Sequence, residues 1–172
     1  MRAALSASVS PLRMPSYVFT RRWSSFFFFE AELFTEPGFL RTVDKLRLAE
    51  GSKAVCLGAI AEDSNQIIED FLLNDEPGSQ IEQYRFVLEG KNVDGWGYSL
   101  GRQGAISDLG AWCIYAETDS EIAVIAFDVA KPAQYERFLD DVSGRRIHDH
   151  PPGYIYRHLP AGWKALLIAN YS

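Results

Sequence analysis

The stretch with the clearest catalytic pattern is Gly97-Tyr98-Ser99-Leu100-Gly101, which matches the G-x-S-x-G nucleophile elbow. In that motif, a strained turn between a strand and a helix exposes the serine hydroxyl. Chain order also permits a triad with a later acid and histidine, namely Asp128 or Asp140 with His148, His150 or His158. The flanking residues argue against catalysis, because 91–95 is not an apolar strand and 102–104 is a poor helix start. A small serine hydrolase using Ser99, Asp128 and His150 is therefore the alternative hypothesis.

All three histidines fall between His148 and His158. In an extended segment, His148 and His150 would share one face, and with Asp141 or Asp149 they could ligate zinc. A single His-x-His pair is weak evidence, however, and prolines follow it directly, so we predict an exposed loop and no metal site. The glycine-rich segment lacks the G-K-[ST] of a P-loop, and no dinucleotide fingerprint is present. We therefore predict no cofactor.

The region from Glu62 to Asp94 holds nine acids and only two basic residues, Arg85 and Lys91. Trp96 and Tyr98 follow shortly afterwards, with Trp112 further on. Acids around aromatic anchors are typical of a protein-binding surface. The residues predicted to form this surface are Glu69, Asp70, Asp75, Glu76, Trp96 and Tyr98. An ordinary solvated face beside core aromatics is the competing interpretation.

Charge and composition exclude several classes of protein. The net charge is −6, but residues 1–29 carry four arginines and no acid, so the remainder has 13 basic and 23 acidic residues, a net of −10. An acidic body argues against nucleic-acid binding, which requires cations against phosphate. No apolar run approaches the roughly 20 residues needed to cross a bilayer. Cys56 and Cys113 stand in apolar runs without metal-type spacing, which favours buried thiols in a reducing cytoplasm.

These candidate sites must be positioned by a scaffold that is clearest between Ala111 and Val142. We expect a strand at 112–116, a turn at 117–120 and a second strand, Ile122–Phe127. The second strand is apolar on both alternating faces, which predicts an interior strand covered on both sides. Pro132 then favours a helix start, and a helix with its apolar face at Tyr135, Phe138, Leu139 and Val142 should end near Gly144.

The rest of the chain predicts alternating strands and helices. We expect strands at 17–23, 26–34, 53–60, 81–88, 96–100 and 163–171, and helices from about Thr35 to Glu50 and at 64–72. The irregular order of these elements predicts an α+β fold with a mixed, mainly antiparallel sheet and about three helices packed on it. Residues 1–16 are rich in Ala, Ser and Arg. We expect them to be a flexible leader without core residues, ahead of a single domain at 17–172, and we expect residues 1–14 to be dispensable. A transit peptide, or a true start at Met14, is the alternative interpretation.

The pair of runs Trp112-Cys113-Ile114-Tyr115 and Glu121-Ile122-Ala123-Val124-Ile125-Ala126 resembles stretches of small bacterial α+β proteins, some of them immunity proteins of toxin systems. The resemblance spans about thirty residues and assigns no site residues. It implies a cytoplasmic protein that binds and blocks a toxin. The sequence thus predicts a non-enzymatic protein-binding domain whose partner is a basic protein such as a nuclease toxin, and it leaves the oligomeric state open.

Overall fold

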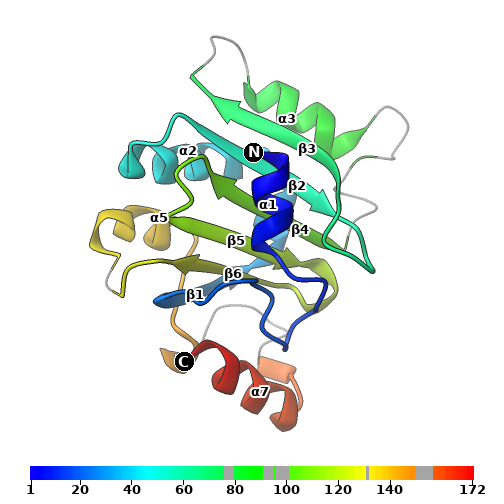
Figure 1. Cartoon of the computed structure of the whole chain (residues 1–172), viewed down its shortest axis with the longest axis vertical. Helices are drawn as coiled ribbons and strands as arrows, with labels where there is room; N and C mark the ends of the chain where they lie inside the picture. The colour runs from blue at the N-terminus through cyan, green and yellow to red at the C-terminus, as the bar shows by residue number, and fades with distance from the viewer. Residues whose placement is uncertain (76–79, 91–94, 96–100, 131, 150–156) are drawn as a thin grey trace.

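The fold is built on one six-stranded antiparallel sheet, with helices on both of its faces (Figure 1). The computed structural model describes residues 1–75, 80–90, 95, 101–130, 132–149 and 157–172. Within the sheet the strand order is β1-β6-β5-β4-β2-β3. The strands are β1 (Ser25–Glu30), β2 (Ala54–Ile60), β3 (Ile67–Asn74), β4 (Arg102–Ser107), β5 (Trp112–Glu117) and β6 (Ile122–Phe127). The predicted α+β class is confirmed, and every strand pairing is antiparallel.

Five α-helices are described, where the sequence predicted about three. They are α1 (Arg2–Ser8), α2 (Phe39–Glu50), α3 (Gln80–Glu89), α5 (Glu136–Asp141) and α7 (Ala161–Tyr171). Short 3-10 helices are η1 (Ala31–Thr35), η2 (Thr118–Ser120), η3 (Ala133–Tyr135) and η4 (Ile147–Asp149). The helices α2, α3 and α5 pack on one face of the sheet, while α1 and α7 pack against the other (Figure 1).

The scaffold between β5 and α5 agrees with the sequence. All six residues of β6 are buried, because β1 and β5 flank the strand and apolar layers cover both of its faces. The helix predicted after Pro132 is present as η3 and α5. Helix α2 ends at Gly51 as predicted, where a φ of 77° suits glycine, which has no Cβ to strain.

Three predicted elements have the wrong type. The segment 67–74 is strand β3 rather than a helix, because residues 61–66 form a tight turn that folds it back along β2. Conversely, α3 and α7 are helices where strands were expected. Their buried side chains, Tyr84 with Leu88 and Leu167 with Tyr171, are four residues apart, so helical spacing explains the burial better than alternation does.

Strand β4 lies where none of the expected strands falls. Gly104 lies in it where β5 and α1 approach closely, since a Cβ there would lie 3.0 Å from the Ile114 carbonyl oxygen and 3.1 Å from Leu5 Cδ1. The strand expected at 26–34 ends early, and the chain continues as η1. In place of the strand expected at 17–23 there is only an isolated bridge between Val9 and Phe19. The strand expected at 96–100 lies outside the described residues.

The first sixteen residues differ most from expectation. They form α1 and a following segment that lie across the sheet face opposite to α2. Leu5 and Val9 are completely buried and Met14 is 5% exposed. The prediction that the core begins only at Tyr17 is therefore wrong. Only these three large apolar residues of the segment are buried, while Leu12 is 53% exposed, and so few residues give no clear periodic pattern in the sequence.

Candidate functional site

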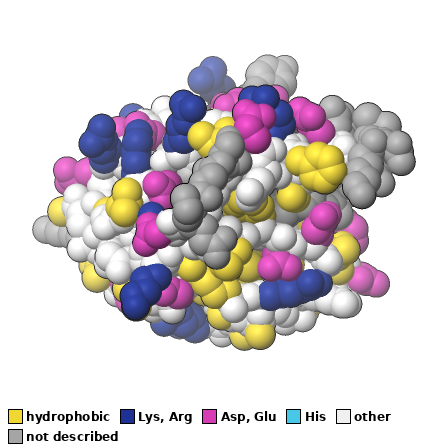
Figure 2. Space-filling view, turned by 90° about the horizontal axis from the view of Figure 1, so that it is seen from above, with side chains coloured by type: hydrophobic (Ala, Val, Ile, Leu, Met, Phe, Trp, Pro, Cys, Tyr) yellow, Lys and Arg dark blue, Asp and Glu magenta, His cyan; other side chains and the backbone are white. Residues whose placement is uncertain are grey.

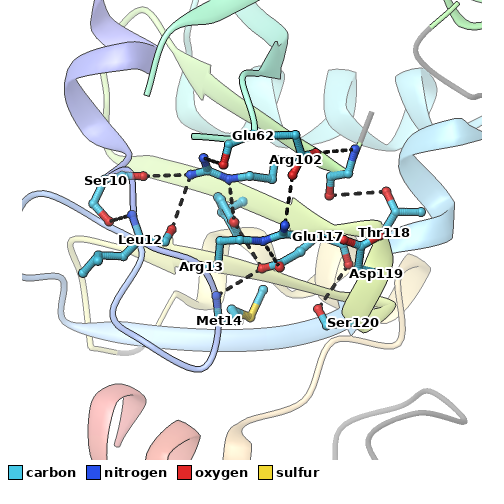
Figure 3. Close-up of polar contacts among 12 residues, drawn as sticks. Ser10, Leu12, Arg13, Met14, Glu62, Arg102, Glu117, Thr118, Asp119 and Ser120 are labelled. Carbon is cyan, nitrogen blue, oxygen red and sulfur yellow. Dashed lines mark hydrogen bonds and ion pairs between the residues drawn. The ribbon is translucent and has the colours of Figure 1, made fainter. Parts of the chain in front are cut away.

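The most concentrated buried chemistry lies at one end of β4 and β5, around Arg102 (Figure 3). Arg102 is fully buried, and its guanidinium donates hydrogen bonds to main-chain carbonyls of two different segments. Its Nη1 donates to the carbonyls of Ala61 (2.8 Å) and Ser64 (2.9 Å), and its Nη2 to those of Ser10 (2.9 Å) and Leu12 (3.3 Å). One side chain thus joins β4, the β2–β3 turn and the N-terminal segment.

Glu117, at the end of β5, forms the second centre of this cluster (Figure 3). Its buried carboxylate accepts hydrogen bonds from Arg13 Nε (2.6 Å), the Met14 amide (3.1 Å) and the Tyr115 hydroxyl (3.2 Å). The same hydroxyl accepts a bond from Arg102 Nε (3.0 Å), so the two centres are connected. Burial and the Glu117 charge raise the pKa of Tyr115, which keeps its proton available for Glu117.

Arg13 extends the cluster to the surface, where it pairs with Glu62 (2.9 Å) and Asp119 (2.6 Å). In the contacts drawn in Figure 3, the donors are guanidinium, amide and hydroxyl groups, and the acceptors are carbonyl, hydroxyl and carboxylate oxygens. Among the described residues, no thiol and no imidazole takes part in these contacts. The arrangement fixes the N-terminal segment on the sheet. We therefore assign it a structural role.

The surface with binding character lies along the β3 edge of the sheet and on α3. There, Ile68, Leu72 and Phe86 are 51%, 47% and 55% exposed. Of these three, Phe86 also lines an open hollow of about 520 Å³, together with Phe71, Glu82, Gln83 and Val87. Figure 2 looks onto this end of the molecule and shows apolar side chains interspersed with acids and with several cations.

The acids predicted to form a binding face are distributed unevenly. Glu69 and Asp70 are exposed on β3, and Asp75 directly follows the strand. Asp70 pairs with Arg2 (3.3 Å) and Asp75 with the buried Arg47 (2.8 Å). The remaining predicted binding residues, Glu76, Trp96 and Tyr98, lie outside the described residues.

The negative charge of the Glu62–Asp94 region is therefore partly neutralised by arginines from elsewhere in the chain. Among the described acids of that region, Glu62, Asp70 and Asp75 each pair with an arginine outside it, and Glu82 pairs with Arg85. Asp63, Glu69 and Glu89 form no ion pair within the described part of the chain. The face keeps acidic character, but less than its sequence suggests.

The hydrolase hypothesis rests largely on residues outside the described ranges, since both Ser99 and His150 fall there. Asp128 is exposed just after β6, where its amide donates to the Ala111 carbonyl (3.1 Å). His148 is exposed in η4, within 3.1 Å of the Ser172 hydroxyl. The described residues contain no cluster of three or more His, Cys, Asp or Glu side chains that could hold a metal ion.

Both cysteines are free and completely buried, on β2 and β5 respectively. Burial raises the pKa of Cys56 to about 11 and that of Cys113 to about 12. A nucleophilic cysteine needs a low pKa and access to solvent. These two thiols therefore serve as core residues in the folded state.

The comparisons with known proteins add no relatives, because no family model, curated protein or solved structure matches the chain. Across the described ranges, no helix combines the length and the apolar character needed to span a membrane.

Sequence reasoning missed the Arg13, Arg102 and Glu117 cluster altogether. Arg102 stands next to glycines in a stretch without a predicted strand, and Arg13 stands in the predicted leader. A signal was nevertheless present, because four arginines without acids precede a body with a net charge of −10. That asymmetry predicts that the N-terminal segment pairs with the body.

Proposed function

We propose that this chain is a non-enzymatic protein-binding domain that recognises a basic protein partner through β3 and α3. The observation that carries the proposal is that this edge exposes apolar side chains, Ile68 and Leu72 on β3 and Phe86 on α3, and also Glu69, whose carboxylate forms no ion pair within the described part of the chain. Interfaces combine apolar anchors with a polar rim. Acids in that rim favour a partner of opposite charge and accelerate its association.

The ion pairs of this surface leave it able to bind. Arg2 and Asp70, with side chains 51% and 31% exposed, form a partly solvated pair on β3. Exposed pairs of this kind contribute only about 0–1 kcal/mol, so a partner's cation can replace Arg2 at small cost. Asp75 differs, because its partner Arg47 is 4% exposed and is held in place by Asp44 as well, so a partner's cation cannot easily replace it. Glu69 and Asp70 are thus better binding candidates than Asp75.

The finer assignment follows the resemblance of β5 and β6 to small bacterial proteins that include toxin immunity proteins. We propose that the partner is a basic toxin, such as a nuclease, and that the chain blocks it in the cytoplasm. Two free, buried thiols fit that reducing compartment. The acidic β3 surface would then oppose the cationic surface with which a nuclease holds its substrate.

The test is kinetic. A partner captured by the immobilised chain is identified and purified, and its association is followed by stopped flow at low and high salt. Asp63→Asn, Glu69→Gln and Asp70→Asn are combined in one variant. The matched control combines Glu32→Gln, Glu36→Gln and Glu136→Gln, three exposed acids on η1, the following turn and α5. Both variants change the net charge by the same amount.

The binding surface predicts that only the first variant slows association, and that salt reduces the difference, because long-range attraction is screened. Equal on-rates for the two variants, or rates indifferent to salt, would overturn the role of β3. The hydrolase alternative has a separate test in reaction with a fluorophosphonate probe. Labelling that disappears in Ser99→Ala would replace the binding proposal with catalysis.

A further inference from the structure

We infer that the partner adds an extended segment to the outer edge of β3, with a cationic side chain taking the place of Arg2. This inference rests on the proposed function, for which it supplies the mode of recognition. Strand β3 is an edge strand that pairs only with β2 among the described strands. An edge strand presents unpaired main-chain groups, which an extended peptide can use as hydrogen-bond partners.

Arg2 shows that this edge accepts a guanidinium. Its Nη2 donates to the main-chain carbonyls of Ile67 and Ile68, the latter at 2.9 Å, while its Nη1 pairs with Asp70. Two carbonyls and one carboxylate thus converge on a single cation at the start of β3. Because the Arg2 side chain is half exposed, an incoming arginine or lysine can compete for the same three oxygens.

The two sides of β3 predict the pattern of such a segment. Successive side chains of a strand point to opposite faces of the sheet. Asp70 and Leu72 lie on the α1 side, while Glu69 and Phe71 lie on the α3 side, next to the open hollow. Each side thus has one acid and one apolar residue of β3, but the oxygens around Arg2 lie at the α1 side and the apolar hollow at the α3 side. A segment that alternates basic and apolar residues would place its cations toward Asp70 and its apolar side chains toward the hollow.

Charge also distinguishes this occupant from a second copy of the chain. In a symmetric antiparallel pair of β3 strands centred on Asp70 and Phe71, the Glu69 and Asp70 carboxylates of both copies would lie close together. Like charges at neighbouring cross-strand positions destabilise a sheet. The edge therefore favours a basic strand over its own copy.

The probe is an acetylated eight-residue peptide of alternating arginine and valine, labelled for fluorescence anisotropy. Two control peptides accompany it, one with glutamate in place of arginine and one methylated on all its main-chain amides. Amide hydrogen exchange of the full chain provides the second readout. We expect the arginine peptide alone to bind and to slow exchange at 67–72. Equal binding by the methylated peptide, or unchanged exchange in β3, would overturn strand addition.

Arg2→Ala removes the internal competitor, so it should tighten the peptide by about two- to fivefold, the range expected for loss of an exposed pair. Asp70→Asn should weaken it by a similar factor. Arg41→Ala, which removes an exposed arginine from α2, is the matched control and should leave binding unchanged. An Arg2→Ala variant that binds no more tightly than Arg41→Ala would contradict the competition.

The results separate this inference from the proposed function. If the captured partner depends on Asp63, Glu69 and Asp70 but the arginine peptide leaves β3 exchange unchanged, protein binding stands and strand addition fails. If the peptide slows amide exchange in β3 but association of the captured partner does not depend on these acids, strand addition at β3 stands and the proposed function fails.

Discussion

The two edges of the sheet are closed in different ways. At β1, the amide and carbonyl of Phe28 exchange main-chain hydrogen bonds of 2.7 and 3.0 Å with Arg145, and its ring packs against Tyr171 of α7. At β3, one exposed arginine side chain reaches two carbonyls, and Ile68 and Leu72 stay about half exposed. Main-chain hydrogen bonds and aromatic packing hold the β1 edge permanently closed, whereas another cation can replace the solvated Arg2 side chain at the β3 edge. This difference is why we propose β3, and not β1, as the edge that a partner uses.

The largest expected effect compares the sheet interior with the β3 edge. Val124 of β6 is completely buried, whereas Leu72 of β3 is 47% exposed. Val124→Asp buries a charge without a partner and should prevent folding. Leu72→Asp should change the free energy of unfolding by only about 0.5 kcal/mol. Urea denaturation followed by circular dichroism measures both, and a Val124→Asp protein that melts like its parent would show that β6 is assigned wrongly.

Removal of residues 1–14 should have the next largest effect, although the sequence alone predicts that they are dispensable. The truncation takes away the buried side chains of Leu5 and Val9 and also the contacts of Arg13 with Glu117. Complete burial of two such aliphatic side chains stabilises a fold by roughly 3–6 kcal/mol. We therefore expect a marked loss in the free energy of unfolding. An unchanged melting temperature would show that this segment does not pack on the sheet in solution.

Phe28→Ala tests the permanent closure of the β1 edge. Phe28 is 1% exposed, and its ring centroid lies 5.4 Å from that of Tyr171. Truncating such a core aromatic costs about 3–5 kcal/mol. Ile68→Ala at the β3 edge, where the side chain is half exposed, is the matched control and should cost well under half of that. Similar losses for both variants would remove the distinction between the edges.

The same contrast explains what the sequence could predict. Strand β6 was predictable because a continuous apolar run with turn residues on both sides is compatible with few structures other than a buried strand. β3 and α3 were not, since their short amphipathic runs fit either period, and the decision came from pairing with β2 and packing of Tyr84. Tertiary pairing overrides local pattern in such segments.

The sequence shows where the acids of the candidate surface lie along the chain, but not which of them are paired in the fold. Counting acids identified the region around Glu69 and Asp70. Arg2 and Arg47 neutralise part of it from positions 68 and 28 residues away from Asp70 and Asp75, and no local pattern encodes such contacts. The burial of Arg102 likewise depends on carbonyls supplied by segments far from it in sequence.

The smallest expected effect is a difference in local opening, which the two cysteines report. Cys56 lies on β2 opposite Leu72 of the β3 edge, whereas Cys113 lies on β5 inside the sheet. Regions with few buried contacts open more often than the core. In native protein, alkylation by iodoacetamide, mapped by mass spectrometry, should therefore reach Cys56 before Cys113. In urea the two thiols should react equally.

The pH dependence of the alkylation rate shows whether Cys56 reacts in the folded protein or only after local opening. In the folded protein, burial raises the pKa of Cys56 to about 11, so direct reaction would keep accelerating up to that pH. An opened, solvated thiol has an ordinary pKa of about 8.5, so a rate that levels off near this pH indicates reaction through opening. Arg2→Ala should accelerate alkylation of Cys56 several-fold without affecting Cys113, because it frees only the β3 edge. Equal acceleration of both thiols would mean that Arg2 stabilises the whole fold, and the β3 edge would then be no more replaceable than the β1 edge.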